Sequence, residues 1–346
     1  FPDFSFYKNI DLEESYNGAF YFGSSGYQKL YNTNIYEAQV NNDFSFSSFD
    51  YINTGLVTNY NFLLKNFNTY SENSTVFDDN ADHELFGTLI LNSEFPLRKK
   101  LSYSTNYLKP KFQFKFSPTN GKDISSDSGR LGYDSLFSSN RIGRSDMVEE
   151  GKSLTIGLEF EKQNLTNEKL FGLSFGNVIK DKKNFSMPSK AKLDQTRSDI
   201  VGNIFYKPNE SIKLEYNFSY DRDLDFSNYD SIKARFGANK LITSFDYFTE
   251  NHEIGNSETI SNDTLIKFSD EHSFLFNTIK DLQTDFTEHY RLSYEYETDC
   301  LFATFQYQKK FFRDGNLIPD ESLSFLIKFI PFTELRGSAN TLFKKN

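Results

Sequence analysis

Cysteine, tryptophan and positive charge are all scarce in this sequence. Its 346 residues include one cysteine, Cys300, and no tryptophan. A single cysteine cannot form a disulfide within the chain and cannot build a multi-cysteine zinc site. The formal net charge of −10 argues against a general nucleic-acid-binding protein, because such proteins present a basic surface to the phosphates. We therefore expect no nucleic-acid partner.

Long apolar runs are also missing. No stretch approaches the roughly 18 apolar residues that predict a transmembrane helix. The longest candidate, residues 85–95, is short and interrupted by polar residues. The sequence carries no signal-peptide pattern and starts with Phe1 instead of methionine. We therefore expect a mature product or a portion of a longer protein.

The motifs of common enzymes are absent as well. The four histidines are scattered without a metalloprotease pair, and there is no glycine-rich phosphate loop and no nucleophile elbow. Residues 221–226 hold three aspartates at calcium-loop spacing, but the glycine and glutamate that an EF-hand requires further along are replaced. We interpret this segment as a solvated loop, and the neighbouring carboxylates Glu149 and Glu150 as part of a turn rather than an acid–base pair. The chain is predicted not to be an enzyme, with no catalytic, cofactor-binding or metal-binding residues and no cofactor.

The sequence is rich in aromatic residues, and they alternate strictly with polar ones. Aromatics make up 17% of the chain, with 39 Phe and 21 Tyr, although the mean hydropathy is −0.59. In residues 111–116, phenylalanines alternate with Lys111, Gln113 and Lys115. The same period of two recurs at 153–161, 213–220, 301–307 and 322–329. Because successive side chains of a strand point to opposite faces, this pattern predicts an all-β chain of about 17 strands.

The connections between these strands alternate between short and long from residue 118 onward. The short ones are 162–168, 207–210, 238–240, 269–272 and 298–299, and the long ones are 118–151, 181–197, 221–230, 249–258, 280–285 and 312–321. In an up-and-down sheet alternate connections lie at opposite ends, so one end is tight and the other looped. Transmembrane β-barrels have this asymmetry, and strands near ten residues suit a tilted crossing of the bilayer. We therefore predict an antiparallel up-and-down transmembrane β-barrel portion. A soluble β-sandwich or β-helix is the alternative, although sandwich strands are usually shorter.

Several segments, taken in order, resemble the LptD family of outer-membrane lipopolysaccharide-assembly proteins. Residues 135–160 are similar to the family's Asn-Arg pair, following Asp and strand-initiating Gly, here Asn140, Arg141, Asp146 and Gly151. The other segments that carry the resemblance are 1–9, 31–40, 108–118, 197–221 and 296–329. The resemblance covers nearly the whole chain.

The resemblance implies a fold, a function and a set of partners. It implies an outer-membrane barrel that inserts lipopolysaccharide into the outer leaflet through a barrel lumen and a lateral gate. The implied partners are lipopolysaccharide, an LptE-like lipoprotein plug, the periplasmic proteins that bridge lipopolysaccharide to the barrel, and outer-membrane lipid. Because the family barrel has more strands than we count, residues 1–331 are expected to be the C-terminal portion of an incomplete barrel, with a C-terminal tail at 332–346.

Two sites follow from the same resemblance. It implies a disulfide between Cys300 and a cysteine outside this chain, in the periplasmic N-terminal region of the family; the alternative is a free, half-buried thiol at the start of a strand. The connection at 298–299 is on the short-turn side, in agreement with a periplasmic position. The candidate lateral-gate strand presents four apolar residues on one face, Leu323, Phe325, Ile327 and Phe329.

Two other functions stay open. The polar faces of the strands would suit a wet lumen for a polar or amphipathic cargo, which also fits a porin-like or receptor-type outer-membrane channel. A soluble or surface-attached β-rich binding protein is the third possibility.

Overall fold

The chain is almost entirely β-structure. The computed structural model describes residues 3–11, 17–31, 33–74, 77, 79–118, 123–126, 129–144, 147–251, 256–311, 320–330 and 333–339. These residues contain twenty strands, which are assigned to one sheet, and two short helices, α1 (Tyr133–Leu136) and η1 (Ser189–Ala191). No helix within this described part has the length and apolar character needed to cross a membrane. Asp146 lies outside the described residues.

The chain divides into two compact units, which we describe separately. Unit 1 comprises residues 1–162, 174–202 and 220–225, and unit 2 comprises residues 163–173, 203–219 and 226–346.

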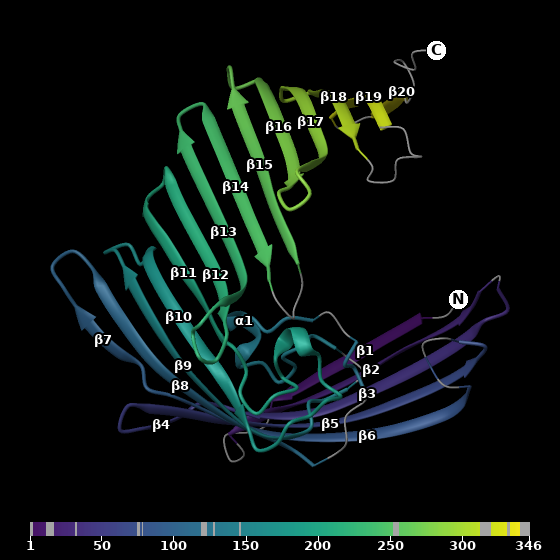
Figure 1. Ribbon diagram of the computed structural model, residues 1–346, viewed down its shortest axis with the longest axis vertical. Coiled ribbons are helices and arrows are strands. Elements are labelled where there is room, and N and C mark those ends of the chain that lie inside the picture. The colour runs from purple at the N-terminus through teal and green to yellow at the C-terminus, as the bar shows by residue number, and fades with distance from the viewer. Residues whose placement is uncertain are drawn as a thin grey trace. The chain divides into compact units, whose positions relative to one another are not determined.

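Unit 1 holds the strands of the N-terminal half, which run side by side in Figure 1. They are β1 (Asp3–Asp11), β2 (Gly18–Leu30), β3 (Tyr36–Ser48), β4 (Tyr51–Asn53), β5 (Leu56–Glu72), β6 (Asn80–Glu94), β7 (Leu97–Lys100), β8 (Thr105–Ser117), β9 (Gly151–Gln163) and most of β10 (Lys169–Lys180). Consecutive long strands pair antiparallel, from β1 with β2 to β6 with β8. The short strands β4 and β7 pair only with the ends of β5 and β8.

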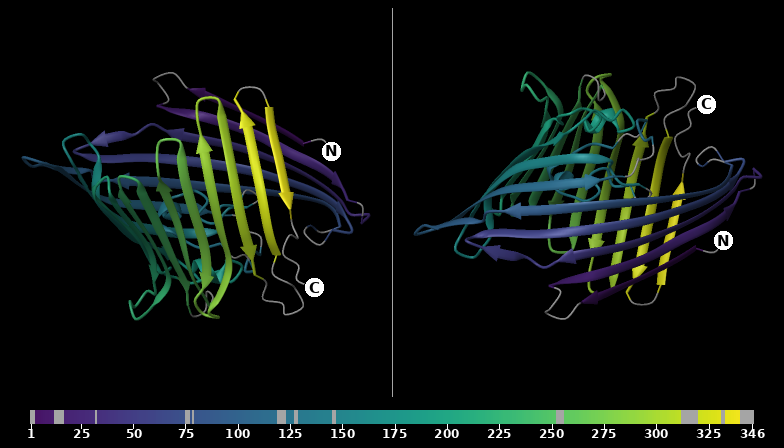
Figure 2. Two further views of the ribbon diagram at one scale, coloured as in Figure 1. Left: turned by 90° about the horizontal axis from the view of Figure 1, so that it is seen from above. Right: turned by 90° about the horizontal axis from the view of Figure 1, so that it is seen from below.

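Unit 2 continues the same up-and-down pattern, and Figure 2 shows its strands as neighbouring arrows of alternating direction. The remaining strands are β11 (Ile200–Asn209), β12 (Ile212–Tyr220), β13 (Ser227–Ala238), β14 (Leu241–Glu250), β15 (Ser257–Lys267), β16 (His272–Asp281), β17 (Phe286–Glu297), β18 (Leu301–Lys310), β19 (Asp320–Phe329) and β20 (Thr333–Ala339). Each strand from β13 to β20 pairs antiparallel with the next.

The predicted fold class is confirmed, and the strand count is corrected from about 17 to twenty. β4 and β7 have three and four residues, too few to form an alternating window. β20 lies within the segment that we assigned to a tail, and it pairs with β19. The boundary at residue 331 between a barrel portion and a tail stays a prediction.

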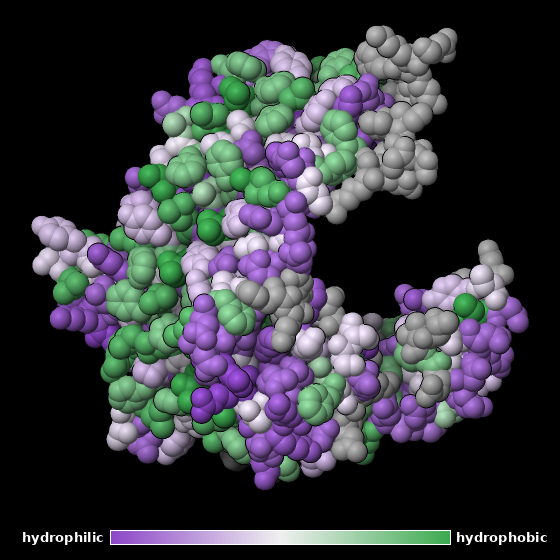
Figure 3. All heavy atoms as spheres, in the orientation of Figure 1, coloured by the Kyte–Doolittle hydropathy of each residue, from purple (hydrophilic) through white to green (hydrophobic). Residues whose placement is uncertain are grey.

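The two faces of unit 1 differ in burial. One face exposes large apolar side chains; examples are Phe44, Phe62, Leu91, Phe114 and Ile156. Figure 3 shows hydrophobic residues where Figure 1 labels β8 and β9. We call the opposite face the loop face, because the connection between β8 and β9 covers it. Its side chains are buried, among them Lys65, Phe67, Phe86, Gln113, Lys115 and Thr155. The alternation of the sequence therefore predicts correctly which residues share a face. The polar face of unit 1, however, is covered by the connection between β8 and β9 instead of being exposed to water.

An apolar core joins the two long connections of unit 1. It contains Ile124, Leu131, Leu136, Met147, Val178, Met187, Ala191, Leu193 and Val201. The connections also share a backbone hydrogen bond from the N–H of Ile124 to the carbonyl of Ser186, 2.8 Å long. A second cluster packs Val148 against Phe67 and Phe86 of the strands. These contacts hold the connections 118–150 and 181–199 together on the loop face.

Two glycines make room for this packing. A Cβ on Gly176 of β10 would lie 2.5 Å from the carbonyl oxygen of Ile156 and 2.7 Å from Leu136 Cδ2. A Cβ on Gly157 of β9 would lie 2.7 Å from the ring of Phe137. Since real Cβ atoms do not approach so closely, the helix α1 and the residue after it can reach the strands only because both positions lack a side chain.

Candidate functional site

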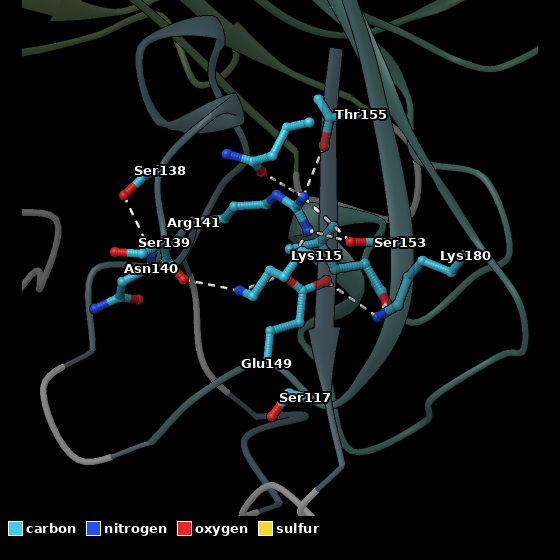
Figure 4. Close-up of polar contacts among 12 residues, drawn as sticks. Lys115, Ser117, Ser138, Ser139, Asn140, Arg141, Glu149, Ser153, Thr155 and Lys180 are labelled. Atoms are coloured by element: carbon cyan, nitrogen blue, oxygen red, sulfur yellow. Dashed lines mark hydrogen bonds and ion pairs between the residues drawn. The ribbon is translucent and has the colours of Figure 1, made fainter. Parts of the chain in front are cut away.

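The connection between β8 and β9 carries Arg141 to the loop face. The preceding residue, Asn140, folds the chain back: its Oδ1 accepts hydrogen bonds from the N–H groups of Gly143 and Arg144, at 2.9 and 3.1 Å. This is the local turn that asparagine side chains favour. Gly143 has a φ of +80°, a conformation that suits glycine. The turn leaves the Arg141 side chain directed toward the strands, as Figure 4 shows.

Every N–H group of the Arg141 guanidinium has a partner. Nη1 donates to Glu149 Oε2 at 2.7 Å and to Ser153 Oγ at 3.2 Å. Nη2 donates to Gln113 Oε1 at 3.1 Å and to Thr155 Oγ1 at 2.7 Å. Nε donates to the carbonyl of Leu136 at 3.1 Å. Because all five donors are used, this arginine has no capacity left for a ligand.

Glu149 is the carboxylate at the centre of a buried charge cluster. Its Oε2 lies 2.7 Å from Arg141 Nη1 and 3.3 Å from Lys115 Nζ, and its Oε1 lies 3.3 Å from Lys180 Nζ. The side chains of these four residues are between 0% and 5% exposed. We call Lys115, Arg141, Glu149 and Lys180 the charge hub.

The cations of the charge hub decide the ionisation of its carboxylate. Burial raises the pKa of Glu149, but attraction to Arg141, Lys115 and Lys180 outweighs burial and holds this pKa well below its usual range. The two lysines are also anchored by the connections: Lys115 Nζ donates to the carbonyl of Ser139 and Lys180 Nζ to that of Leu193, each at 2.8 Å. The charge hub therefore ties both connections of unit 1 to the strands β8, β9 and β10.

The chemistry of the charge hub is that of a structural lock. A saturated arginine, two anchored lysines and an ionised carboxylate offer neither a free base nor a nucleophile. Removing one partner from such a buried set leaves an uncompensated charge and costs about 3–5 kcal/mol. The arrangement fixes the connection 118–150 against the sheet.

Sequence reasoning singled out part of this hub and missed the rest. Asn140 and Arg141 belong to the motif behind the family resemblance, and the structure gives them the turn and the central guanidinium. Glu149, read as part of a turn, was the missed partner, and Glu150 beside it makes only an exposed pair with Lys182 at 3.2 Å. A signal for this partner was present in the sequence. The connection between β8 and β9 is about thirty residues long, which is unusual for a loop without a function or a packing role, and it contains an arginine and a glutamate, while the strands carry lysines on their polar face.

The structure places Cys300 in the connection between β17 and β18. The thiol is exposed, and the carbonyl of Cys300 accepts a hydrogen bond from the N–H of Ile330, 2.9 Å long. Its position in a tight connection agrees with the sequence analysis, whereas the thiol is exposed instead of half-buried. The disulfide to a cysteine outside this chain stays a prediction.

The four residues of the candidate gate strand share one face of β19. Leu323, Phe325 and Phe329 are 38–42% exposed and Ile327 lies between them. β19 is paired on one edge with β18 and on the other with β20, so it is not the last strand. The role of these residues in a gate stays a prediction.

The three aspartates of residues 221–226 form a loop, as expected. Asp221 Oδ1 accepts a hydrogen bond from the N–H of Asp225 at 2.8 Å, and Asp223 pairs with Arg222 at 3.3 Å. These contacts are those of a solvent-exposed turn.

Comparison with known proteins identifies a family. The family model described as LptD, LPS transport system D, matches residues 20–287 of the chain. No curated protein matches it.

Among solved structures, the siderophore receptor PirA from Acinetobacter baumannii is 10% identical, with a TM-score of 0.47, over 99% of this chain and 67% of that one. A variant of the ferric enterobactin receptor PfeA from Pseudomonas aeruginosa is 11% identical, with a TM-score of 0.49, over 99% and 64%. A variant of the porin from Rh. blastica is 11% identical, with a TM-score of 0.27, over 96% and 93%. The chain thus spans about two thirds of the receptors that it matches.

Proposed function

Since the chain belongs to the LptD family of lipopolysaccharide transport proteins, we propose that it inserts lipopolysaccharide into the outer leaflet through a barrel lumen and a lateral gate. The chain is an outer-membrane β-barrel protein. The proposal concerns what the barrel does there, and with which residues.

The observation that carries the proposal is the difference between the two faces of unit 2. One face is aromatic and exposed, with Phe236, Phe245, Tyr294, Phe305 and Phe325. The opposite face is polar, with residues such as Ser244, Asp263, Asn277, Arg291 and Gln306, which line a groove of about 420 Å³. Lipopolysaccharide has the same two-sided chemistry, an apolar acyl part and a hydrophilic saccharide part. The polar face would line the lumen, and the aromatic face would contact lipid.

No covalent step is part of this function. The saccharide would move along the polar face while the acyl chains pass sideways into lipid. We propose that β19 takes part in the gate through Leu323, Phe325, Ile327 and Phe329, because these apolar side chains share one face of the strand and three of them are exposed.

The partners follow from the same proposal. An LptE-like lipoprotein plug and the periplasmic bridge proteins would deliver and support the cargo, and Cys300 would form a disulfide with a cysteine outside this chain. The exposure of the thiol supports such a bond, because an accessible thiol can be reached by a second cysteine.

Depletion of the protein from its host tests the function. We expect surface lipopolysaccharide to fall and a photocrosslinking residue at polar-face positions, such as Gln306, to capture lipopolysaccharide in the full-length protein. Ion conductance by the reconstituted protein, with unchanged surface lipopolysaccharide after depletion, would instead favour the porin-like or receptor-type channel. Solubility without detergent would contradict both barrel functions and favour the β-rich binding protein.

A further inference from the structure

A straight row of polar side chains crosses the polar face of unit 2. Residues directly opposite each other in antiparallel strands lie on the same face of the sheet. From β13 to β18 the register sets the following residues opposite one another in turn: Arg235, Ser244, Asp263, Asn277, Arg291 and Gln308. We call these six residues the arginine row. Five of them, all except Gln308, line the groove of about 420 Å³.

The two arginines of the row have no partner in the part of unit 2 that the structure describes. Among the described residues, Arg235 forms no hydrogen bond or ion pair, and Nε of Arg291 is buried without an acceptor. The carboxylate of the row, Asp263, accepts a hydrogen bond from Asn277, whose Nδ2 donates to Asp263 Oδ1 at 2.6 Å. In turn, Asn277 Oδ1 is bonded to His289 Nε2 at 2.7 Å. Asp263 and Asn277 in the middle of the row are thus satisfied internally, while Arg235 and Arg291 on either side of them keep free guanidinium groups.

Two lysines near Arg235, one on its own strand and one on β12, are paired. Lys233, two residues before Arg235, lies 3.3 Å from Asp246, and Lys213 lies 2.8 Å from Glu215. The lysines nearest to Arg235 are therefore neutralised, whereas Arg235 itself is not. The two arginines of the row contrast with Arg141 of unit 1, whose donors are all used.

The geometry of the row suits a ligand with two separated anionic groups. Adjacent strands lie about 4.8 Å apart, so the four steps from Arg235 to Arg291 span roughly 19 Å of sheet. The planar fork of arginine fits phosphate and carboxylate groups through two parallel hydrogen bonds. Between the forks, the hydroxyl of Ser244 and the pair of Asp263 and Asn277 offer hydrogen bonds to sugar hydroxyls, while the negative charge of Asp263 keeps anionic groups toward the ends.

We propose that the arginine row binds the phosphorylated saccharide part of lipopolysaccharide, with Arg235 and Arg291 each holding an anionic group. The identity of the ligand rests on the proposed function. The assignment of these two arginines goes beyond it, because it names the side chains that contact the cargo and the groups they recognise.

The test uses full-length protein with its partner chains and a photocrosslinking residue at Gln306, which lines the groove outside the row. Native and dephosphorylated lipopolysaccharide are the two probes. The double variant Arg235→Gln and Arg291→Gln should capture native lipopolysaccharide at least about tenfold less than the unmodified protein, since charge-assisted bonds are lost. Capture of dephosphorylated lipopolysaccharide should be the same for both proteins.

The matched control is Lys233→Gln, on the same strand and face but already paired, which should change capture by less than about twofold. Arg235→Lys with Arg291→Lys should restore part of the capture, because lysine keeps the charge without the fork. These lysine variants also carry the test if the glutamine variants fail to assemble, as judged by heat-dependent migration in electrophoresis.

Equal capture of native lipopolysaccharide by the unmodified protein and the double variant would overturn the assignment of the arginines while leaving the transport function intact. If capture falls equally for native and dephosphorylated probes, recognition of phosphate is wrong. The absence of capture from all polar-face positions of the unmodified protein would overturn the transport function and the arginine row together.

Discussion

Replacing Glu149 with glutamine should release the connection 118–150 from the loop face. Glutamine keeps the size of the side chain and removes its charge. The cations Lys115, Arg141 and Lys180, which are 0–2% exposed, would then face one another without a carboxylate. Breaking a buried ionic cluster by removing one member costs about 3–5 kcal/mol.

This cost sets the size of the expected effect. Each 1.4 kcal/mol is about a tenfold change in an equilibrium constant, so local opening should become roughly a hundredfold or more frequent. Hydrogen–deuterium exchange of residues 129–144 should accelerate by that factor, because exchange follows local opening. Exchange in β14 to β16 of unit 2 should stay unchanged, since these strands supply none of the residues bonded to the charge hub.

A functional readout accompanies the exchange experiment. If the connection covers part of a water path, the released form should show larger ion conductance in planar bilayers than the unmodified protein. Glu150→Gln is the matched control, because the partner of Glu150, Lys182, is 62% exposed and such pairs contribute at most about 1 kcal/mol. Exchange of residues 129–144 within twofold of the unmodified protein in the Glu149→Gln variant would refute the role of the charge hub.

Three further predictions follow from the same structure. Because the pKa of Glu149 is lowered in the folded protein, its stabilising contribution is fully present above the unfolded pKa of about 4.3 and is lost as pH falls through the lower folded value. Exchange of residues 129–144, corrected for intrinsic rates, should therefore be constant from pH 7 to 5 and rise below pH 4. A rise already between pH 7 and 5 would contradict this. Gly176→Val should displace α1 by steric clash with Leu136 and accelerate exchange of residues 129–144 about as much as Glu149→Gln does. Gly237→Val is the control, because a Cβ at that position would meet no atom closer than 4.0 Å. The full-length protein should migrate differently in non-reducing and reducing electrophoresis, and Cys300→Ser should abolish the difference; equal migration of the unmodified protein in both conditions would exclude the disulfide.

The strands could be predicted from the sequence because successive side chains of a strand point to opposite faces, so that every second residue shares the same environment. The window 111–116 shows this: its phenylalanines are on the exposed face and Gln113 and Lys115 on the other. Alternation does not say what covers a face. The burial of Lys115 depends on a connection that returns from residue 149, and no periodic pattern in that connection reports the contact.

The connection lengths were the other informative signal, because turn chemistry is local. The exception is 280–285, which was expected to be long, since only residues 282–285 separate β16 from β17. In unit 2, the tight connection at 239–240 begins with Asn239 at a φ of +42°, a conformation that asparagine tolerates. The short strands β4 and β7 were not predictable, because their pairing depends on the neighbouring ends of β5 and β8.

The arginines of the two units show how the same side chain can serve opposite purposes on polar faces. Arg141 is buried, each of its donors has an acceptor, and its removal would leave Glu149 with two lysines; it stabilises a fixed arrangement. Arg291 lies in a groove with an unsatisfied Nε, and Arg235 is exposed four strands away. An unsatisfied buried donor costs about 1–3 kcal/mol, and a transient ligand that supplies the missing acceptor recovers this free energy. The arginine row is therefore suited to bind a cargo reversibly, whereas the charge hub is suited to hold the connection 118–150 permanently against the sheet.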